Sequence, residues 1–218
     1  MSRHANSVVG SQHMKQLAAI ERHYNAILPD AYKLWAAKGY LTLSSPHYLW
    51  VWEAEWIQLK EMPGYDFSTF PHIPGLIPFA FTGAGDHWCW HMEVPTAPGE
   101  YRVLNCVHDS YMAEVYAPNF AGWFYRTCLE YACSIEDNPK AIKEANKRLG
   151  LWADRLEEIG AGARADELRR LAAAPPVHYR WGPRKMPDFG FLTYAECENR
   201  VREAFGQDYV HQEIPWQQ

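Results

Sequence analysis

Residues 77–92 constrain the fold more than any other stretch of the chain. They read IPFAFTGAGDHWCWHM, in which two apolar, aromatic-rich runs flank a short segment that contains two glycines. Glycine tolerates the positive φ angles of tight turns, and successive residues of a strand point to opposite faces of a sheet. The pattern therefore predicts a β-hairpin, with strands over 78–81 and 87–92 and a turn that contains Gly83 and Gly85.

Further strands and helices surround this hairpin in the sequence. Apolar residues at helical spacing predict two N-terminal helices and one helix that begins at Asn119 as its cap. Runs rich in aromatic and branched residues predict short strands. The predicted helices span 14–27, 29–38 and 119–134, and the predicted strands beside the hairpin span 40–43, 48–52, 101–107 and 111–116.

The character of the chain changes after Asp137. Two or three short helices are predicted up to Pro175, separated by Gly150 and Gly160, and an irregular stretch with at most one strand follows. Thr193 and Glu196 have the spacing of a capping box, so a last helix is predicted from there to Gly206. We expect an α+β fold: N-terminal helices packed on a mostly antiparallel sheet over 14–135, and a helical C-terminal extension over 136–218 packed on the same domain.

Composition is typical of a folded, soluble chain. Hydrophobic residues make up 48% of the sequence, which is enough to bury a core. The five cysteines are odd in number and include no closely spaced pair, which favours free thiols. The first residues lack the apolar run of a signal peptide, and no stretch is long and apolar enough for a membrane span. We therefore expect a cytoplasmic protein that does not enter a membrane.

Charge is spread unevenly along a chain whose net charge is −5. Residues 40–115 contain nine acidic and only two basic side chains, whereas residues 139–185 contain eleven basic and six acidic ones. One interpretation is ordinary solvated surface. The other is an acidic surface that binds a basic partner, which charge complementarity would favour. The candidate partner-binding residues in this second interpretation are Glu53, Glu55, Asp86, Glu93 and Glu114.

A metal site or a catalytic site is the alternative for the hairpin. His87, Cys89 and His91 share one face of the predicted strand, and Cys106 and His108 could join them from a neighbouring strand. Their spacing matches no zinc motif, and a cysteine between tryptophans is typical of a core, so we expect no metal and no cofactor. The sequence also lacks a nucleophile elbow, a phosphate-binding loop and an isolated carboxylate pair, so we predict no catalytic residues. The basic excess is too small to favour nucleic acid.

Three segments in this order resemble domains of the SUKH superfamily. IERHYNAILPDAYKLWAAKGY resembles the opening of those domains, with a helix, a Leu-Pro pair, an acidic residue, Tyr-Lys and an apolar pair. IPFAFTGAGDHWCWHM resembles their central hairpin, and FAGWFYRTCLEYA the helix that follows their sheet. The resemblance covers about residues 20–134. It departs at residues 37–39, where the family often has Asn-Gly, and residues after 137 have no recognised counterpart.

The superfamily includes many bacterial immunity proteins of toxin systems and fungal regulators of cell-wall synthesis. The resemblance implies a structural hairpin, in which Gly83 and Gly85 make the turn and Asp86 accepts backbone N–H bonds. It also implies an immunity protein that neutralises a cognate toxin, such as a nuclease, by direct binding without catalysis. An intracellular regulatory or scaffold module without a toxin partner is the alternative, and a metal-dependent enzyme is the third hypothesis.

Overall fold

The chain divides into two compact units. The computed structural model describes residues 3–66, 73–209 and 212–215. Residues 1–120 and 211–218 form the first unit, and residues 121–210 form the second. The division predicted from the sequence, between residues 135 and 136, falls inside the second unit. None of the helices in the described part of the chain is long and apolar enough to cross a membrane.

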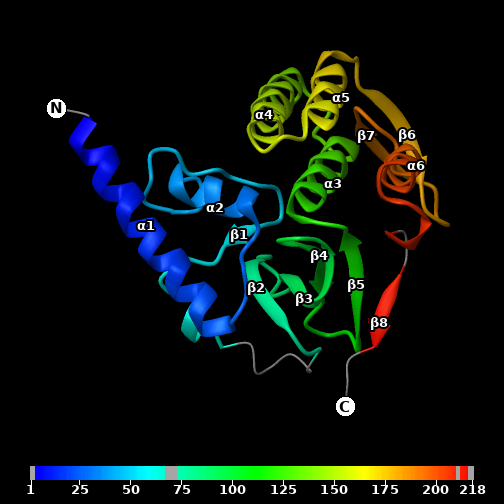
Figure 1. The fold of residues 1–218 in the computed structure, drawn as a ribbon. Helices are drawn as coiled ribbons and strands as arrows, with labels where there is room; N and C mark the ends of the chain where they lie inside the picture. The colour runs from blue at the N-terminus through cyan, green and yellow to red at the C-terminus, as the bar shows by residue number, and fades with distance from the viewer. Residues whose placement is uncertain (1–2, 67–72, 210–211, 216–218) are drawn as a thin grey trace. The chain divides into compact units, whose positions relative to one another are not determined.

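Two helices open the first unit. Helix α1 spans Arg3–Tyr24 and runs beside the sheet, and the shorter helix α2 spans Asp30–Ala37 (Figure 1). Glu21 of α1 joins them: its Oε1 atom accepts the backbone N–H of Leu28, in the connection, at 3.0 Å and lies 3.5 Å from Nζ of Lys33 on α2. Leu17 and Ile20 of α1 are buried. These two residues are three positions apart and therefore lie on the same face of the helix, which is the face that α1 buries.

Six antiparallel strands form the sheet of the first unit, in the order β1-β2-β3-β4-β5-β8. This arrangement, with its helices, confirms the predicted α+β class. The predicted hairpin is β2 and β3, which pair in antiparallel register. The strands are β1 (Glu55–Trp56), β2 (Leu76–Phe81), β3 (His87–Ala97), β4 (Glu100–Cys106), β5 (Met112–Ala117) and β8 (Glu213–Pro215).

An aromatic cluster fills the core of the first unit. The ring of Trp90 on β3 stacks on Phe79, with centroids 4.5 Å apart, and meets the edge of Tyr32 on α2 at 4.7 Å. Trp35 and Phe120 complete the cluster, with centroids 5.1 Å apart. Edge-to-face and offset contacts of this kind stabilise a core beyond the area that they bury. The aromatic richness of the sequence is therefore explained largely by packing.

The predicted strands at 40–43 and 48–52 are wrong. Within residues 40–54, all of which the structure describes, the only β pairing is a bridge between Val51 and Ala54. Leu41 and Leu49 are nevertheless buried, and the Leu49 carbonyl accepts the indole N–H of Trp56 at 2.8 Å. Leu43 and Trp50 are exposed, whereas Tyr40, Leu41, Leu49 and Val51 enter the core from a loop. Their burial, rather than strand pairing, produced the hydrophobic pattern.

The turn between β2 and β3 is tight, and Thr82 organises it. The backbone N–H of Thr82 donates to the Asp86 carbonyl at 2.8 Å, and its Oγ1 accepts the backbone N–H groups of Ala84 and Asp86. Gly85 has a φ of +99°, whereas Gly83 is absent from the residues with positive φ. Of the two glycines predicted to make the turn, only Gly85 therefore needs the conformational freedom of glycine.

Replacing Gly85 with valine should destabilise the first unit by about 1–3 kcal/mol, because a branched residue is strained at this φ. The Cβ atom itself is not crowded, since its nearest neighbour would be the His108 ring at 3.8 Å. Urea unfolding measures the effect. Gly83→Val is the matched control, because nothing lies within 4 Å of its Cβ position. Equal stabilities of the two variants would contradict the assigned turn.

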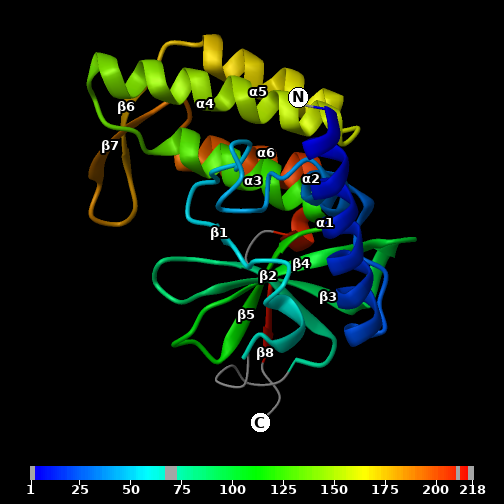
Figure 2. The ribbon, with the colours of Figure 1, turned by 90° about the vertical axis from the view of Figure 1, so that its left-hand side faces the viewer.

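Helices dominate the second unit. They are α3 (Phe120–Cys133, whose first residue belongs to the first unit), α4 (Pro139–Glu158), α5 (Gly162–Ala173) and α6 (Tyr194–Phe205). Helices α4 and α5 lie side by side in both ribbon views (Figures 1 and 2). Thr193 and Glu196 form the predicted capping box at the start of α6. The remaining elements are β6 (Val177–Trp181), β7 (Met186–Gly190) and the short 3-10 helix η2 (Gln207–Tyr209).

Two predictions for this unit are wrong. Gly150 lies inside α4 and does not divide it, because the buried stripe of Leu149, Trp152 and Leu156 continues past the glycine. A single glycine costs a helix about 1 kcal/mol, which tertiary packing readily offsets. The stretch predicted to be irregular forms a two-stranded hairpin, β6 with β7, instead of at most one strand.

Candidate functional site: the acidic turn end of the sheet

Alternating strand directions bring two connections to the same end of the sheet. The β2–β3 turn (82–86) and the β4–β5 loop (107–111) both lie there, because β2 and β4 run in the same direction. We call this end the turn end. A row of paired residues crosses the sheet just inside it, from Glu55 on β1 through His87 on β3 to Ile214 on β8.

Acidic residues gather at the turn end. Glu114 on β5 pairs with Glu213 on β8, and both lie next to the residues of this row. Asp86 lies in the β2–β3 turn and Asp109 in the β4–β5 loop. The four segments that build the turn end, residues 53–56, 81–87, 106–114 and 212–215, contain no lysine and no arginine. We call the following set the turn-end acids: Glu53, Glu55, Asp86, Asp109, Glu114 and Glu213.

Asp86 ties the two connections together. Its Oδ1 atom accepts the backbone N–H of His108 at 3.1 Å and lies 2.8 Å from Nδ1 of the same residue. Its Oδ2 atom accepts the Thr82 hydroxyl at 3.2 Å. The Asp86 side chain thus accepts a backbone N–H, as the family resemblance implied, but from the neighbouring loop. Within its own turn, that role belongs to Thr82.

These hydrogen bonds set the protonation of the pair. Partial burial alone would raise the pKa of the Asp86 carboxyl, but the bonds from His108 and Thr82 outweigh it and lower that pKa below its ordinary value. The same hydrogen bond raises the pKa of His108. Asp86 therefore remains negatively charged at neutral pH, although its partner imidazole is the nearest group able to neutralise it.

Glu53 lies close to Asp86. Its backbone has a positive φ of 50°, and its carbonyl accepts the indole N–H of Trp88 at 3.4 Å. Partial burial raises the pKa of the Glu53 carboxyl, and the nearby Asp86 carboxylate raises it further. Two of the five predicted partner-binding acids are thus close enough to interact electrostatically.

Glu55 and Glu114 belong to the same end, and Glu93 does not. Glu55 is exposed on β1, and Glu114 is half-buried on β5, four strand spacings away, or roughly 19 Å. Glu93 lies six residues beyond His87 along β3, roughly 20 Å from the turn end. It packs beside Gly75, where an added Cβ would be 2.7 Å from its Cγ atom. The structure therefore separates Glu93 from the other four candidates.

An exposed aromatic residue accompanies these acids. Tyr111, in the β4–β5 loop, is 82% exposed, the largest value among the large hydrophobic residues whose exposure the structure describes. Tyrosine is enriched among residues that anchor protein interfaces. Sequence reasoning missed Tyr111, Asp109 and Glu213 as site residues. The first two lie in a stretch without a recognised motif, and Glu213 joins the sheet from a distant part of the sequence.

The His-x-Cys-x-His face of β3 is interior. His87 Nε2 lies 2.7 Å from the Tyr65 hydroxyl, Cys89 is buried, and His91 Nδ1 accepts the Nε–H of Arg102 at 3.0 Å. Burial lowers the pKa of His87, and burial together with the Arg102 charge lowers the pKa of His91 to about 4. Across residues 3–66, 73–209 and 212–215, no group of three His, Cys, Asp or Glu side chains is placed to hold a metal ion.

His91 should make stability depend on pH. Its pKa is about 4 in the folded chain and 6.5 as the ordinary value, so the unfolded chain takes up this proton first as pH falls. The stabilisation is complete above pH 6.5 and is lost as pH falls toward 4. After allowance for solvent screening, we expect it to be about 1–2 kcal/mol. Urea unfolding at pH 7.5, 6 and 4.5 measures this slope.

His91→Gln should flatten that slope, and His47→Gln controls for the loss of one exposed imidazole. A slope that is unchanged in His91→Gln would show that other groups cause the pH dependence.

Comparison with protein-family models, with curated proteins and with solved structures finds no match to this chain. The site is therefore interpreted from its own chemistry.

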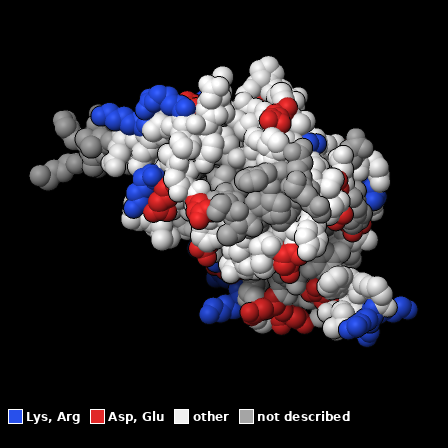
Figure 3. All heavy atoms as spheres, turned by 90° about the horizontal axis from the view of Figure 1, so that it is seen from below, with Lys and Arg blue, Asp and Glu red and all other residues white. Residues whose placement is uncertain are grey.

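Acidic side chains form several groups on the face of the molecule shown in Figure 3.

Proposed function

We propose that this chain is a non-catalytic binding protein whose turn end meets a basic protein surface. The observation that carries the proposal is the clustering of the turn-end acids in segments without lysine or arginine, beside the exposed Tyr111. Opposite charge on two surfaces speeds their encounter and fixes their relative orientation. An exposed aromatic ring supplies the apolar contact that charge alone lacks.

The partner that we propose is a toxin that the chain neutralises. The three segments that resemble SUKH domains support an immunity protein, and a nuclease is a partner of suitable charge, because a site that binds phosphates is basic. An acidic inhibitor that occupies such a site would exclude the substrate. The alternative partner is a host protein, in which case the chain is an intracellular regulatory or scaffold module.

A capture experiment tests the proposal. The purified chain and a variant with Glu53, Glu55 and Glu114 changed to lysine would each be immobilised and exposed to lysate from the source cells. Glu93→Lys is the matched control, since it adds positive charge away from the turn end. We expect a partner that the original chain and the control retain and that the triple variant loses.

Toxicity then distinguishes the two partners. A captured protein that arrests growth when expressed alone, and is harmless when co-expressed with this chain, supports the immunity function. A harmless captured protein supports the regulatory module. Capture that is equal for the original chain and the triple variant would contradict binding through the turn end.

A further inference from the structure

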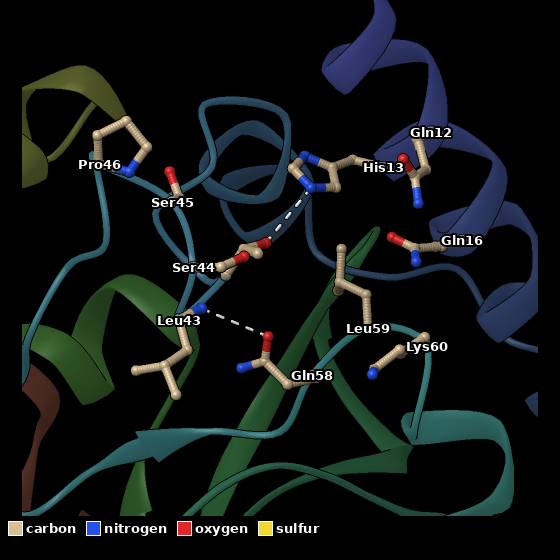
Figure 4. A pocket seen from close by; sticks show the side chains of 11 residues that line it. Gln12, His13, Gln16, Leu43, Ser44, Ser45, Pro46, Gln58, Leu59 and Lys60 are labelled. Carbon is tan, nitrogen blue, oxygen red and sulfur yellow. Dashed lines mark hydrogen bonds between the residues drawn. The ribbon is translucent and has the colours of Figure 1, made fainter.

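A pocket of about 650 Å³ lies in the first unit, away from the turn-end acids, none of which lines it. Three segments form its walls: Gln12, His13 and Gln16 of α1, the loop 42–46, and residues 58–60 (Figure 4). Sites for small molecules usually have volumes of about 300–1,000 Å³. The pocket therefore has room for a compact metabolite.

The polar groups of the wall are held in place. His13 is only 7% exposed, and its Nε2 atom lies 3.3 Å from the Thr42 hydroxyl. Figure 4 shows its ring extending from α1 toward the loop that carries Ser44 and Ser45. The Nδ1 atom of His13 is buried without a hydrogen-bond partner among the described residues. Buried polar atoms are normally paired, so an unpaired one at a pocket wall indicates a site for a missing partner.

Gln58 forms a second fixed polar group. Its Oε1 atom accepts the backbone N–H of Leu43 at 3.4 Å, and its Nε2 atom donates to the Trp56 carbonyl at 3.2 Å. Nε2 also donates to the Leu41 carbonyl at 3.4 Å, so the bonds to Leu41 and Leu43 hold residues 58–60 against the opposite wall, whereas the bond to Trp56 is local. The pocket is thus built from side chains whose positions are set by the fold.

The charge of the lining differs from that of the chain. No aspartate or glutamate is among the described residues that line the pocket, although the chain carries a net charge of −5. Lys60 supplies a largely exposed ammonium group, which forms an ion pair with Glu61, a residue outside the lining, at 3.6 Å. Exposed ion pairs of this kind are weak, so the negative charge of a ligand can replace Glu61. Ser44 contributes a hydroxyl, and Leu43 and Leu59 contribute apolar surface. A pocket lining that offers hydrogen-bond donors and one cationic side chain, without a carboxylate of its own, favours a negatively charged ligand.

We infer that this pocket binds a small organic anion, namely a carboxylate or phosphomonoester on a compact apolar or planar body. Lys60 pairs with the negative charge, and the hydroxyl and amide groups of the wall share its oxygens. Leu43 and Leu59 contact the body of the ligand. This binding site is separate from the proposed partner surface, and the two can be tested independently.

Calorimetric titration of the full chain tests the inference with two anions, adenosine monophosphate and benzoate. Their neutral counterparts, adenosine and benzyl alcohol, and inorganic phosphate complete the set. We expect one of the two organic anions to bind with one-to-one stoichiometry, at least about tenfold more tightly than its neutral counterpart and than inorganic phosphate.

Two pocket variants and one control locate the binding. Lys60→Met should weaken it about three- to tenfold, because an exposed ammonium contributes modestly, and Ser44→Trp should abolish it by filling the pocket. Lys147→Met removes an exposed lysine outside the pocket and should leave binding unchanged. Thermal unfolding without ligand verifies that each variant is folded. The inference is overturned if neither organic anion binds, if the neutral compounds bind equally well, or if both pocket variants retain full affinity.

Discussion

Gly190→Ala should destabilise the second unit by about 2–4 kcal/mol, the largest single-residue effect that we expect. A Cβ atom at this position would lie far inside van der Waals contact with the Cys133 carbonyl and 2.6 Å from the Ala132 oxygen. Both obstacles are backbone atoms. They are also held, because Phe191 donates its N–H to the Ala132 carbonyl at 2.7 Å and Ile135 donates to the Phe189 carbonyl at 2.9 Å.

The end of β7 therefore cannot move away from α3 without breaking these bonds. Urea unfolding followed by circular dichroism measures the loss. Gly150→Ala is the matched control: nothing lies within 4 Å of its Cβ position, and alanine favours a helix interior, so that variant should be as stable as the original or slightly more stable. A Gly190→Ala chain that unfolds at the original midpoint would refute this close approach of backbones.

Charge reversal at the turn end should slow association with the partner by tenfold or more, once that partner is captured. Steered association is faster than neutral association by roughly 10- to 1,000-fold, and salt reduces the gain because the Debye length is about 10 Å at 0.1 M. For the chain with Glu53, Glu55 and Glu114 changed to lysine, the association rate should be slow at low salt, and it should no longer fall as salt is added. Stopped-flow mixing at salt concentrations from roughly 0.02 to 0.5 M measures the association rate and its salt dependence.

Glu93→Lys should change this rate little, since Glu93 lies roughly 20 Å from the turn end along β3. An association rate that is indifferent to salt and to the triple reversal would eliminate electrostatic steering. A contact made through Tyr111 and other apolar groups would still be compatible with that result.

Local signals in the sequence predicted the elements that local chemistry determines. The β2–β3 hairpin follows from alternation and a glycine turn, and the capping box of α6 follows from Thr193 and Glu196. Tertiary effects explain the failures. Helix α4 continues through Gly150 because its buried stripe does, and Leu41 and Leu49 resemble strand residues because a loop carries them into the core. Neither reason is visible in a short window of sequence.

The candidate site was predicted only in part for a similar reason. A charge count along the chain places Glu93 with Glu53 and Asp86, but strand direction sends it to the other end of β3. Glu213 is far from the others in sequence and reaches them only through the pairing of β8 with β5. Topology, which no local pattern records, decides which acids share a surface.

The place of β8 in the chain has a consequence for synthesis on the ribosome. Strand β5 ends at Ala117, and the strand that covers its outer edge is not made until residues 213–215. At about 5–20 residues per second, that edge waits roughly 5–20 s while the second unit is translated. An uncovered strand edge can pair with another chain during that time. The nascent first unit is therefore most exposed to misassembly in this interval, because nascent chains on adjacent ribosomes of the same messenger RNA carry the same open edge.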